Sequence, residues 1–133
     1  MTPEAFVSAK IREEAPTLGL ILFRNNSGAM TDAKGRMLRF GLGNDSQAAC
    51  RKRKSSDLIG VWSPYGVFVA IEVKRPGWVF KGTPREVAHQ NFINEINESG
   101  GIAFFASSWK EVYQKITSYM ENRVDSPVRT AYV

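Results

Sequence analysis

Apolar positions along this chain recur at two different spacings, and each spacing predicts one kind of element. A stripe at helical spacing predicts an opening helix over residues 3–15, with Thr2 as its N-cap and with Pro16 and Gly19 at its end. The members of this stripe are Phe6, Val7, Ile11 and Ala15.

Short and nearly continuous apolar runs predict buried strands. These runs occupy residues 20–23, 58–62, 67–74 and 102–106. Turn-forming residues 63–66 separate the second run from the third. We therefore expect these two strands to form an antiparallel hairpin.

Two more helical patterns follow the hairpin. The first covers residues 84–98 and begins at the capping residue Thr83. The second is capped by Ser107 or Ser108 and continues to about Glu121. Their apolar stripes predict the buried faces, which are Ala88, Phe92 and Ile96 in one helix and Val112, Ile116 and Tyr119 in the other.

The resulting order of elements predicts an α/β (α+β) fold. We expect a central mixed four-stranded sheet flanked by helices, in the order αβββαβ. A chain of 133 residues accommodates one domain, 1–133, with a core over about 3–121 and a loose tail from 122 to 133.

The stretch from Ala29 to Ser56 has no clear periodicity. A brief strand at Met37–Phe40 is compatible with it, and the rest is predicted to be a long polar loop. Loops of this length are uncommon in small domains unless they are functional or disordered. This one carries the basic run Arg51-Lys52-Arg53-Lys54, for which phosphate contact and simple solvation are both open interpretations.

The composition is that of an ordinary globular protein, with 43% hydrophobic and 23% charged residues. A net charge of +5 and a pI near 9.6 favour a polyanionic partner. One cysteine, Cys50, excludes an internal disulfide and a multi-cysteine zinc site, and we expect it to be a passive thiol in a polar loop. With no membrane-length apolar run and a charged N-terminus, we expect an intracellular protein without a membrane partner.

Three charged residues in the predicted hairpin are candidates for catalysis. Side chains alternate along a strand, so Glu72 and Lys74 project from one face, roughly 6.5–7 Å apart. Asp57 opens the preceding strand, and the hairpin would bring it beside Glu72. Two carboxylates suit Mg²⁺, although a solvated salt bridge at an edge strand is the alternative interpretation.

The segments around these residues resemble the PD-(D/E)XK nuclease superfamily. The similarity is closest to its virus-type replication–repair (VRR-Nuc) branch, and in particular to the small stand-alone phage members. It covers residues 12–106, and where the family usually has a proline this chain has Ser56. The segments that carry it are Ser56-Asp57-Leu58-Ile59-Gly60, Ile71-Glu72-Val73-Lys74-Arg75-Pro76, Gln90, Arg24–Ala29 and Arg39–Leu42.

The resemblance implies a restriction-endonuclease-like core and a role for each motif residue. Asp57, Glu72 and the carbonyl of Val73 would bind Mg²⁺, for which Mn²⁺ could substitute. Lys74 would be the catalytic lysine, and Gln90 would position the lysine or the attacking water.

The family also tends to place a glutamate from the first helix at the metal. Glu14 is the preferred candidate because it precedes the first strand at a suitable distance, and Glu4 and Glu13 are rivals. The only histidine, His89, is expected to lie on the surface.

Nucleic acid is the expected partner of the basic and aromatic side chains near these motifs. Trp78 is a candidate for contact with DNA or with a partner subunit. The candidate DNA-binding residues are Arg24, Asn26, Arg39, Arg51, Lys52, Arg53, Lys54, Arg75 and Trp78.

The leading hypothesis is a Mg²⁺-dependent endonuclease that acts on branched DNA. By resemblance to the stand-alone phage members it would resolve four-way junctions as a homodimer, in the cytoplasm of a bacterial host. One alternative is a nuclease for flaps, single strands or duplexes. The other is a basic DNA-binding module without catalysis.

Overall fold

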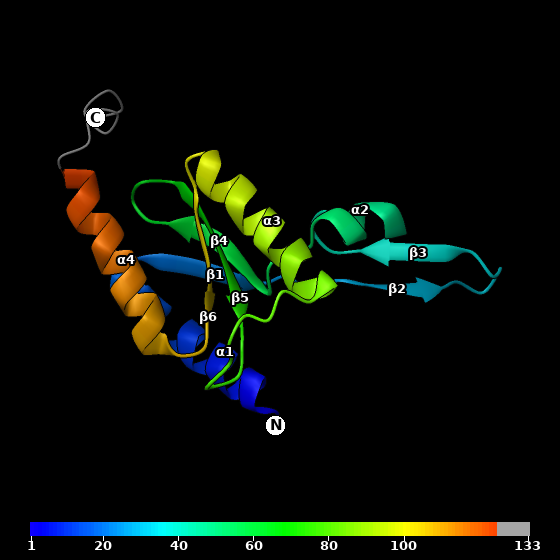
Figure 1. The fold of residues 1–133 in the computed structure, drawn as a ribbon, viewed down its shortest axis with the longest axis horizontal. Helices are drawn as coiled ribbons and strands as arrows, with labels where there is room; N and C mark the ends of the chain where they lie inside the picture. The colour runs from blue at the N-terminus through cyan, green and yellow to red at the C-terminus, as the bar shows by residue number, and fades with distance from the viewer. Residues whose placement is uncertain (125–133) are drawn as a thin grey trace.

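The computed structural model describes residues 1–124 (Figure 1). Residues 125–133 lie outside the described residues, and with them most of the predicted loose tail. The last helix ends at Val124, three residues later than expected. In chain order the elements are α1 (Pro3–Glu14), η1 (Ala15–Leu18), β1 (Leu20–Arg24), β2 (Gly28–Thr31), β3 (Met37–Phe40), α2 (Gln47–Lys52), β4 (Leu58–Trp62), β5 (Val67–Val73), α3 (Pro84–Glu98), β6 (Ile102–Ala106) and α4 (Trp109–Val124).

A mixed four-stranded sheet forms the centre of the protein, as predicted. Its strand order is β1-β4-β5-β6; β4 is antiparallel to both β1 and β5, whereas β6 is parallel to β5. Gly60 allows β1 and β4 to pair, because a Cβ there would lie 1.7 Å from the carbonyl oxygen of Ile21. The predicted α+β fold class is therefore confirmed.

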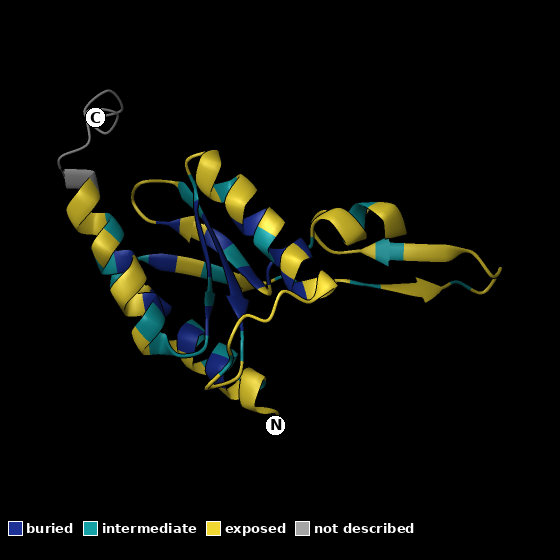
Figure 2. Ribbon diagram, in the orientation of Figure 1, coloured by how far each residue is buried: buried dark blue, intermediate teal, exposed yellow. Residues whose placement is uncertain are grey.

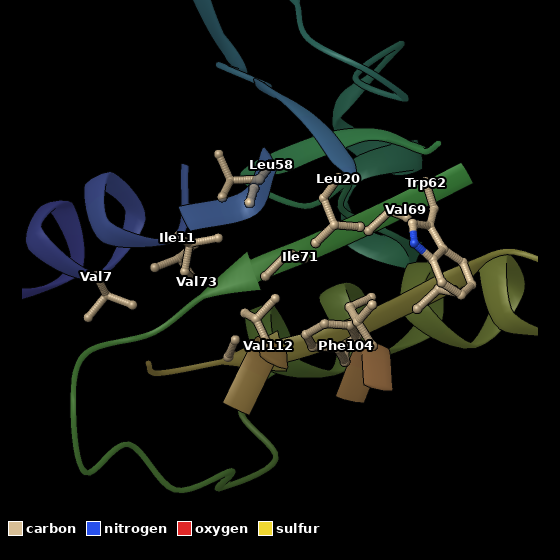
Figure 3. Close-up of a cluster of buried hydrophobic side chains, with 14 residues drawn as sticks. Val7, Ile11, Leu20, Leu58, Trp62, Val69, Ile71, Val73, Phe104 and Val112 are labelled. Atoms are coloured by element: carbon tan, nitrogen blue, oxygen red, sulfur yellow. The ribbon is translucent and has the colours of Figure 1, made fainter. Parts of the chain in front are cut away.

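Helices cover both faces of this sheet (Figure 1). Val69, Ile71 and Val73 of β5 point to the face that α1 and α4 cover, where the main core lies (Figure 3). The opposite face carries Ala70 and packs against Phe92 and Ile93 of α3. The alternation predicted for β5 is correct, and it directs Glu72 toward the α3 face.

The predicted long loop contains regular structure. Strands β2 and β3 pair with each other as a separate two-stranded sheet, and Ser46 caps the short helix α2. We call the β2–β3 hairpin the arm, because it projects away from the central sheet (Figure 1) and is almost entirely exposed (Figure 2). The strand Met37–Phe40 was expected, whereas β2 and α2 were not.

Two asparagines fix the base of the arm. Asn44 donates from Nδ2 to the carbonyl oxygens of Gly28 and Phe40. Asn25 donates to Ser55 Oγ and to the Ser56 carbonyl, and its own N–H donates to the Asp57 carbonyl. These bonds hold the inner end of the arm against the start of β4.

Cys50 belongs to this assembly too. It lies on α2 instead of in a loop, and its Sγ is 2.6 Å from Asn44 Oδ1. The thiol thus supports the asparagine that closes the arm.

Candidate active site

Asp57 and Glu72 lie side by side because β4 and β5 pair in the predicted register. Leu58 is opposite Ile71, so the preceding Asp57 is opposite Glu72. The main-chain N–H of Asp57 donates to Glu72 Oε1 at 3.2 Å, and the N–H of Val73 donates to Asp57 Oδ2 at 3.0 Å. The hairpin thus holds the two carboxylates together through its own backbone.

The two carboxyl groups differ in acidity. Loss of surrounding water, followed by the charge of Glu72, raises the pKa of Asp57 to about 7. Burial also acts to raise the pKa of Glu72, but its neighbours His89, Asp57 and Lys74 together outweigh burial and lower that pKa. In the metal-free pair, a proton taken up as the pH falls toward neutral therefore binds Asp57 before Glu72.

His89 is buried against Glu72, so the expectation of a surface histidine is wrong. The residue is 4% exposed, and its Nε2 lies 3.0 Å from Glu72 Oε2. That is the distance of an ion pair, although Nε2 is not aligned for a directed hydrogen bond. Helical spacing could have revealed it, because Phe92 and Ile93, three and four residues later, are buried on the same face of α3.

Lys74 directly follows β5 and approaches Glu72 from the same face, as predicted. Its Nζ lies 3.8 Å from Glu72 Oε2, and its side chain is 12% exposed. The ammonium also lies over the ring of Trp78, 5.2 Å from the ring centroid. Trp78, expected to contact DNA or a partner subunit, thus packs within the site.

Two other predicted site residues are not brought to this group. Gln90 donates from its amide to Asn94 Oδ1 at 2.8 Å, and the histidine before it takes the position facing Glu72. Glu14 ends α1 and pairs with Lys10 at 3.1 Å. Glu4, the named rival, instead lines a hollow together with Asp57 and Val73.

Two hollows meet at Asp57. The first lies between the arm, α2 and α3, and its cationic lining residues are Arg39, Arg53, Lys54 and Arg85. The second lies beside the start of α1, and Glu4, Arg24, Asn26 and Val73 are among its lining residues. Asn25, Ser27, Asp57 and Arg85 line both. Asp57 therefore faces a surface that is basic on its α2 side.

The predicted DNA-binding residues divide by position. Arg24, Asn26, Arg39, Arg53 and Lys54 line one of the two hollows. Arg53 also makes a two-fold hydrogen bond with the carboxylate of Glu95, at 2.6 and 2.7 Å. The remaining basic candidates, Arg51, Lys52 and Arg75, line neither hollow.

Arg85 was missed by the sequence analysis. It stands in the first turn of α3, where the helix dipole disfavours a positive charge. A cation at that position does not serve the helix dipole, and this was the signal in the sequence that could have drawn attention to Arg85.

The donor set at Asp57 fits a hard divalent cation only in part. Among residues 1–124, no group of three or more histidine, cysteine, aspartate or glutamate side chains is arranged to hold a metal ion. Two adjacent carboxylates are nevertheless sufficient for Mg²⁺, which retains water and takes further oxygens from substrate phosphates. The raised pKa of Asp57 also indicates a negative charge that a cation would relieve.

Comparison with known proteins leaves the chain without a family. No protein-family model, no curated protein and no solved structure matches it. Within the described part of the chain, no helix has the length and apolar character needed to cross a membrane. The site must therefore be interpreted from its own geometry.

Proposed function

We propose that this protein is a Mg²⁺-dependent endonuclease that hydrolyses phosphodiester bonds in DNA. One observation carries the proposal: Asp57 lies where two hollows meet, with Glu72 beside it and Lys74 beside Glu72, and one of those hollows is lined by four cationic side chains. A purely DNA-binding surface gains nothing from a carboxylate pair at the point where phosphate must approach.

Each residue has a defined part in this chemistry. Asp57 and Glu72 would hold Mg²⁺, with the Val73 carbonyl as the further protein ligand that the family resemblance suggests. The metal, when bound, supplies charge for the phosphate oxygens and a more acidic bound water. Lys74 orients the attacking water and offsets the negative charge that develops on the phosphate. His89 contacts the same carboxylate oxygen of Glu72, Oε2, that Lys74 approaches, and so fixes its position.

The strand to be cut would follow the two hollows past Asp57. Arg39, Lys54 and Arg85 contact phosphates on the α2 side, and Arg24 contacts them near α1. Branched DNA is the preferred substrate by the family resemblance, and resolving a four-way junction requires two cuts. A homodimer would provide them, because each chain carries one site.

Cleavage assays test the proposal directly. Labelled four-way junction, flap, duplex and single-stranded DNA are each incubated with the protein in Mg²⁺, Mn²⁺ or EDTA. Glu72→Gln removes one carboxylate charge, and Glu98→Gln, an exposed glutamate on the same helix as His89, is the matched control. We expect cleavage in Mg²⁺ and Mn²⁺ that EDTA and Glu72→Gln abolish and that Glu98→Gln leaves unchanged.

The pattern of products decides between the narrower possibilities. Paired symmetric nicks in the junction alone support a dimeric resolvase. Cuts in flaps, single strands or duplex under the same controls keep the nuclease and reject the resolvase. DNA binding without metal-dependent cleavage of any substrate overturns the proposal in favour of a binding module.

Removing His89 should change how cleavage depends on pH. Glu72 keeps its burial in His89→Ala but loses the partner that lowers its pKa, so its pKa rises. The acidic limb of the pH–rate profile should move to higher pH, so the loss of rate should be largest at the acidic end of the profile. Little change is expected at pH 8.5. Gln90→Ala is the control, and an unchanged profile in His89→Ala would contradict this role.

Arg85 should contribute to DNA affinity through phosphate contact alone. In Arg85→Ala we expect affinity to fall severalfold for every DNA sequence, and the slope of log affinity against log salt to decrease by about 1. Binding is measured by fluorescence anisotropy in EDTA, so that no cleavage occurs. Arg51→Ala, on α2 but outside both hollows, is the matched control. Equal losses in the two variants would contradict a path through the hollows.

A further inference from the structure

We infer that Trp78, together with Phe105, positions the ammonium group of Lys74 for catalysis. This inference rests on the proposed function, because it assumes that Lys74 acts on the reacting phosphate. Trp78 itself is a positioning residue, since it acts through the lysine.

The aromatic rings lie where they can hold the lysine. Lys74 Nζ is 5.2 Å from the centroid of Trp78 and 5.8 Å from the centroid of Phe105. The two rings contact each other, with centroids 4.8 Å apart. Both distances from Nζ are within the range of cation–π attraction. We call this pair of rings the aromatic clamp.

The strand register explains why Phe105 takes part. Phe105 of β6 is paired with Glu72 of β5, so the two side chains are neighbours on the α3 face of the sheet. The N–H of Lys74 donates to the carbonyl oxygen of Ala106 at 2.8 Å, which extends the pairing by one residue. The backbone of Lys74 is therefore fixed, and its side chain leaves the sheet beside Phe105.

Glu86 anchors the other ring of the clamp. Its carboxylate accepts from the indole Nε1 of Trp78 at 2.9 Å, and from the N–H groups of Lys81 and Thr83 at 3.0 Å each. Glu86 is also the N3 residue of the capping box that starts α3. The loop between β5 and α3 is thus tied to the helix, and Trp78 is held in one orientation.

Without the clamp, little would define the position of the Lys74 ammonium. Its contact with Glu72 is 3.8 Å, longer than a hydrogen bond. A lysine side chain has four rotatable carbon–carbon bonds and a strongly hydrated head group. The two rings restrict the movement of the Lys74 side chain and shield its ammonium group from water. Catalysis by a charged group requires both a fixed position and exclusion of water.

The same contacts argue against base stacking as the role of Trp78. Its indole N–H is used by Glu86, one ring contact is with Phe105, and Phe80 meets it edge-on at 6.2 Å. A base would have to displace an established partner of the ring. Loss of Trp78 should therefore lower kcat and leave the affinity for substrate nearly unchanged.

Steady-state kinetics with three variants test the assignment. Trp78→Ala removes the ring, Trp78→Phe keeps an aromatic face but not the indole N–H, and Val79→Ala changes an exposed neighbour in the same loop. We expect Trp78→Ala to lower kcat about tenfold or more with KM within about twofold of wild type. Trp78→Phe should recover most of kcat, and Val79→Ala should match wild type.

A second readout does not depend on cleavage. Protons held over an aromatic ring face are shielded, so the ε-methylene resonance of Lys74 should lie upfield of those of the other lysines in ¹H–¹³C spectra. It is assigned by its absence in Lys74→Arg. We expect it to move toward the other lysines in Trp78→Ala and to stay in Val79→Ala.

The outcomes separate this inference from the proposed function. If wild type cuts no substrate, the nuclease proposal fails, and the spectra still show whether the clamp holds Lys74. If wild type cuts DNA, three results overturn the inference. These are an unchanged kcat in Trp78→Ala, a raised KM with kcat retained, and a kcat in Trp78→Phe as low as in Trp78→Ala.

Discussion

Replacing Lys74 by alanine is expected to lower kcat for DNA cleavage by about 10²–10⁴-fold, the range in which single catalytic acid–base or charge-stabilising groups contribute. The ammonium is largely shielded from water and lies 3.8 Å from the carboxylate of Glu72. No described cation other than Lys74 and His89 forms an ion pair with Glu72, so no neighbour can replace the lost charge. The measurement is single-turnover cleavage in saturating Mg²⁺.

Two comparisons make the Lys74 result specific. Lys81→Ala removes an exposed lysine from the loop after β5 and should retain wild-type rates. DNA affinity of Lys74→Ala in EDTA should stay within a few-fold of wild type, because a rate effect and not a binding effect is expected. Cleavage by Lys74→Ala at more than a tenth of the wild-type rate would remove the lysine from the mechanism.

The second large effect concerns Asp57 and is visible without any substrate. Its folded pKa of about 7 lies above the unfolded value of 3.8 because the folded protein disfavours the charged form. Folding therefore takes up a proton between these two values, and the stability of the metal-free protein should fall as pH rises from about 4 to 7. The contribution of Glu72 has the opposite sign, since its pKa is lowered.

Asp57→Asn isolates the contribution of Asp57. At pH 8 in EDTA this variant should be more stable than wild type. The full rise in the pKa of Asp57 would correspond to a difference of about 4 kcal/mol in the free energy of unfolding. Because Asp57 is exposed to solvent, screening should reduce this difference to about 1–2 kcal/mol. Stability is measured by urea unfolding across the pH range, and the difference between variant and wild type should vanish near pH 4.

Adding metal should make wild type more stable relative to Asp57→Asn, the opposite of the order expected in EDTA. Mg²⁺ or Mn²⁺ binds only the folded protein, so it should raise the melting temperature of wild type and leave Asp57→Asn nearly unchanged. Asp45→Asn, which alters an exposed aspartate beside the arm, should respond to metal like wild type. A variant that is less stable than wild type at pH 8 in EDTA would show that Asp57 is not under electrostatic strain.

The hairpin around Asp57, Glu72 and Lys74 was predictable from sequence alone. Its strands are short apolar runs on either side of a turn, and alternation in β5 fixes which face carries Glu72 and Lys74. Burial of Val69, Ile71 and Val73 against α1 and α4 excludes a one-residue slip of β5, which would turn these side chains away from the core.

The arm could not be predicted by the same logic. Strands β2 and β3 pair only with each other and cover no core, so most of their residues are exposed on both faces. No apolar alternation is needed in such a ribbon, and none appears in its sequence. Its asparagine contacts link residues far apart in the chain, which periodicity cannot detect.

The two residues expected at the site from helices were misplaced in different ways. One position along α3 turns a side chain by about 100°, which is the difference between Gln90 and His89. In α1, Glu4 lines the same hollow as Asp57, while Glu14 lies at the other end of the helix beside Lys10. Sequence spacing pointed to α1 and α3, but not to Glu4, which lines the hollow beside Asp57, or to His89, which contacts Glu72.

The acidic pair and the lysine come from one segment of the chain, whereas the surrounding cations come from several, and this difference affects how the protein could evolve. The two carboxylates and the lysine come from one continuous segment, 57–74, whose own pairing keeps them aligned. The cations around them come from separate elements, with Arg24 on β1, Arg39 on β3, Lys54 after α2 and Arg85 on α3. In the proposed nuclease, mutations of these cations could therefore change which DNA shape is bound, one position at a time, and leave the residues of the proposed chemical step unaltered.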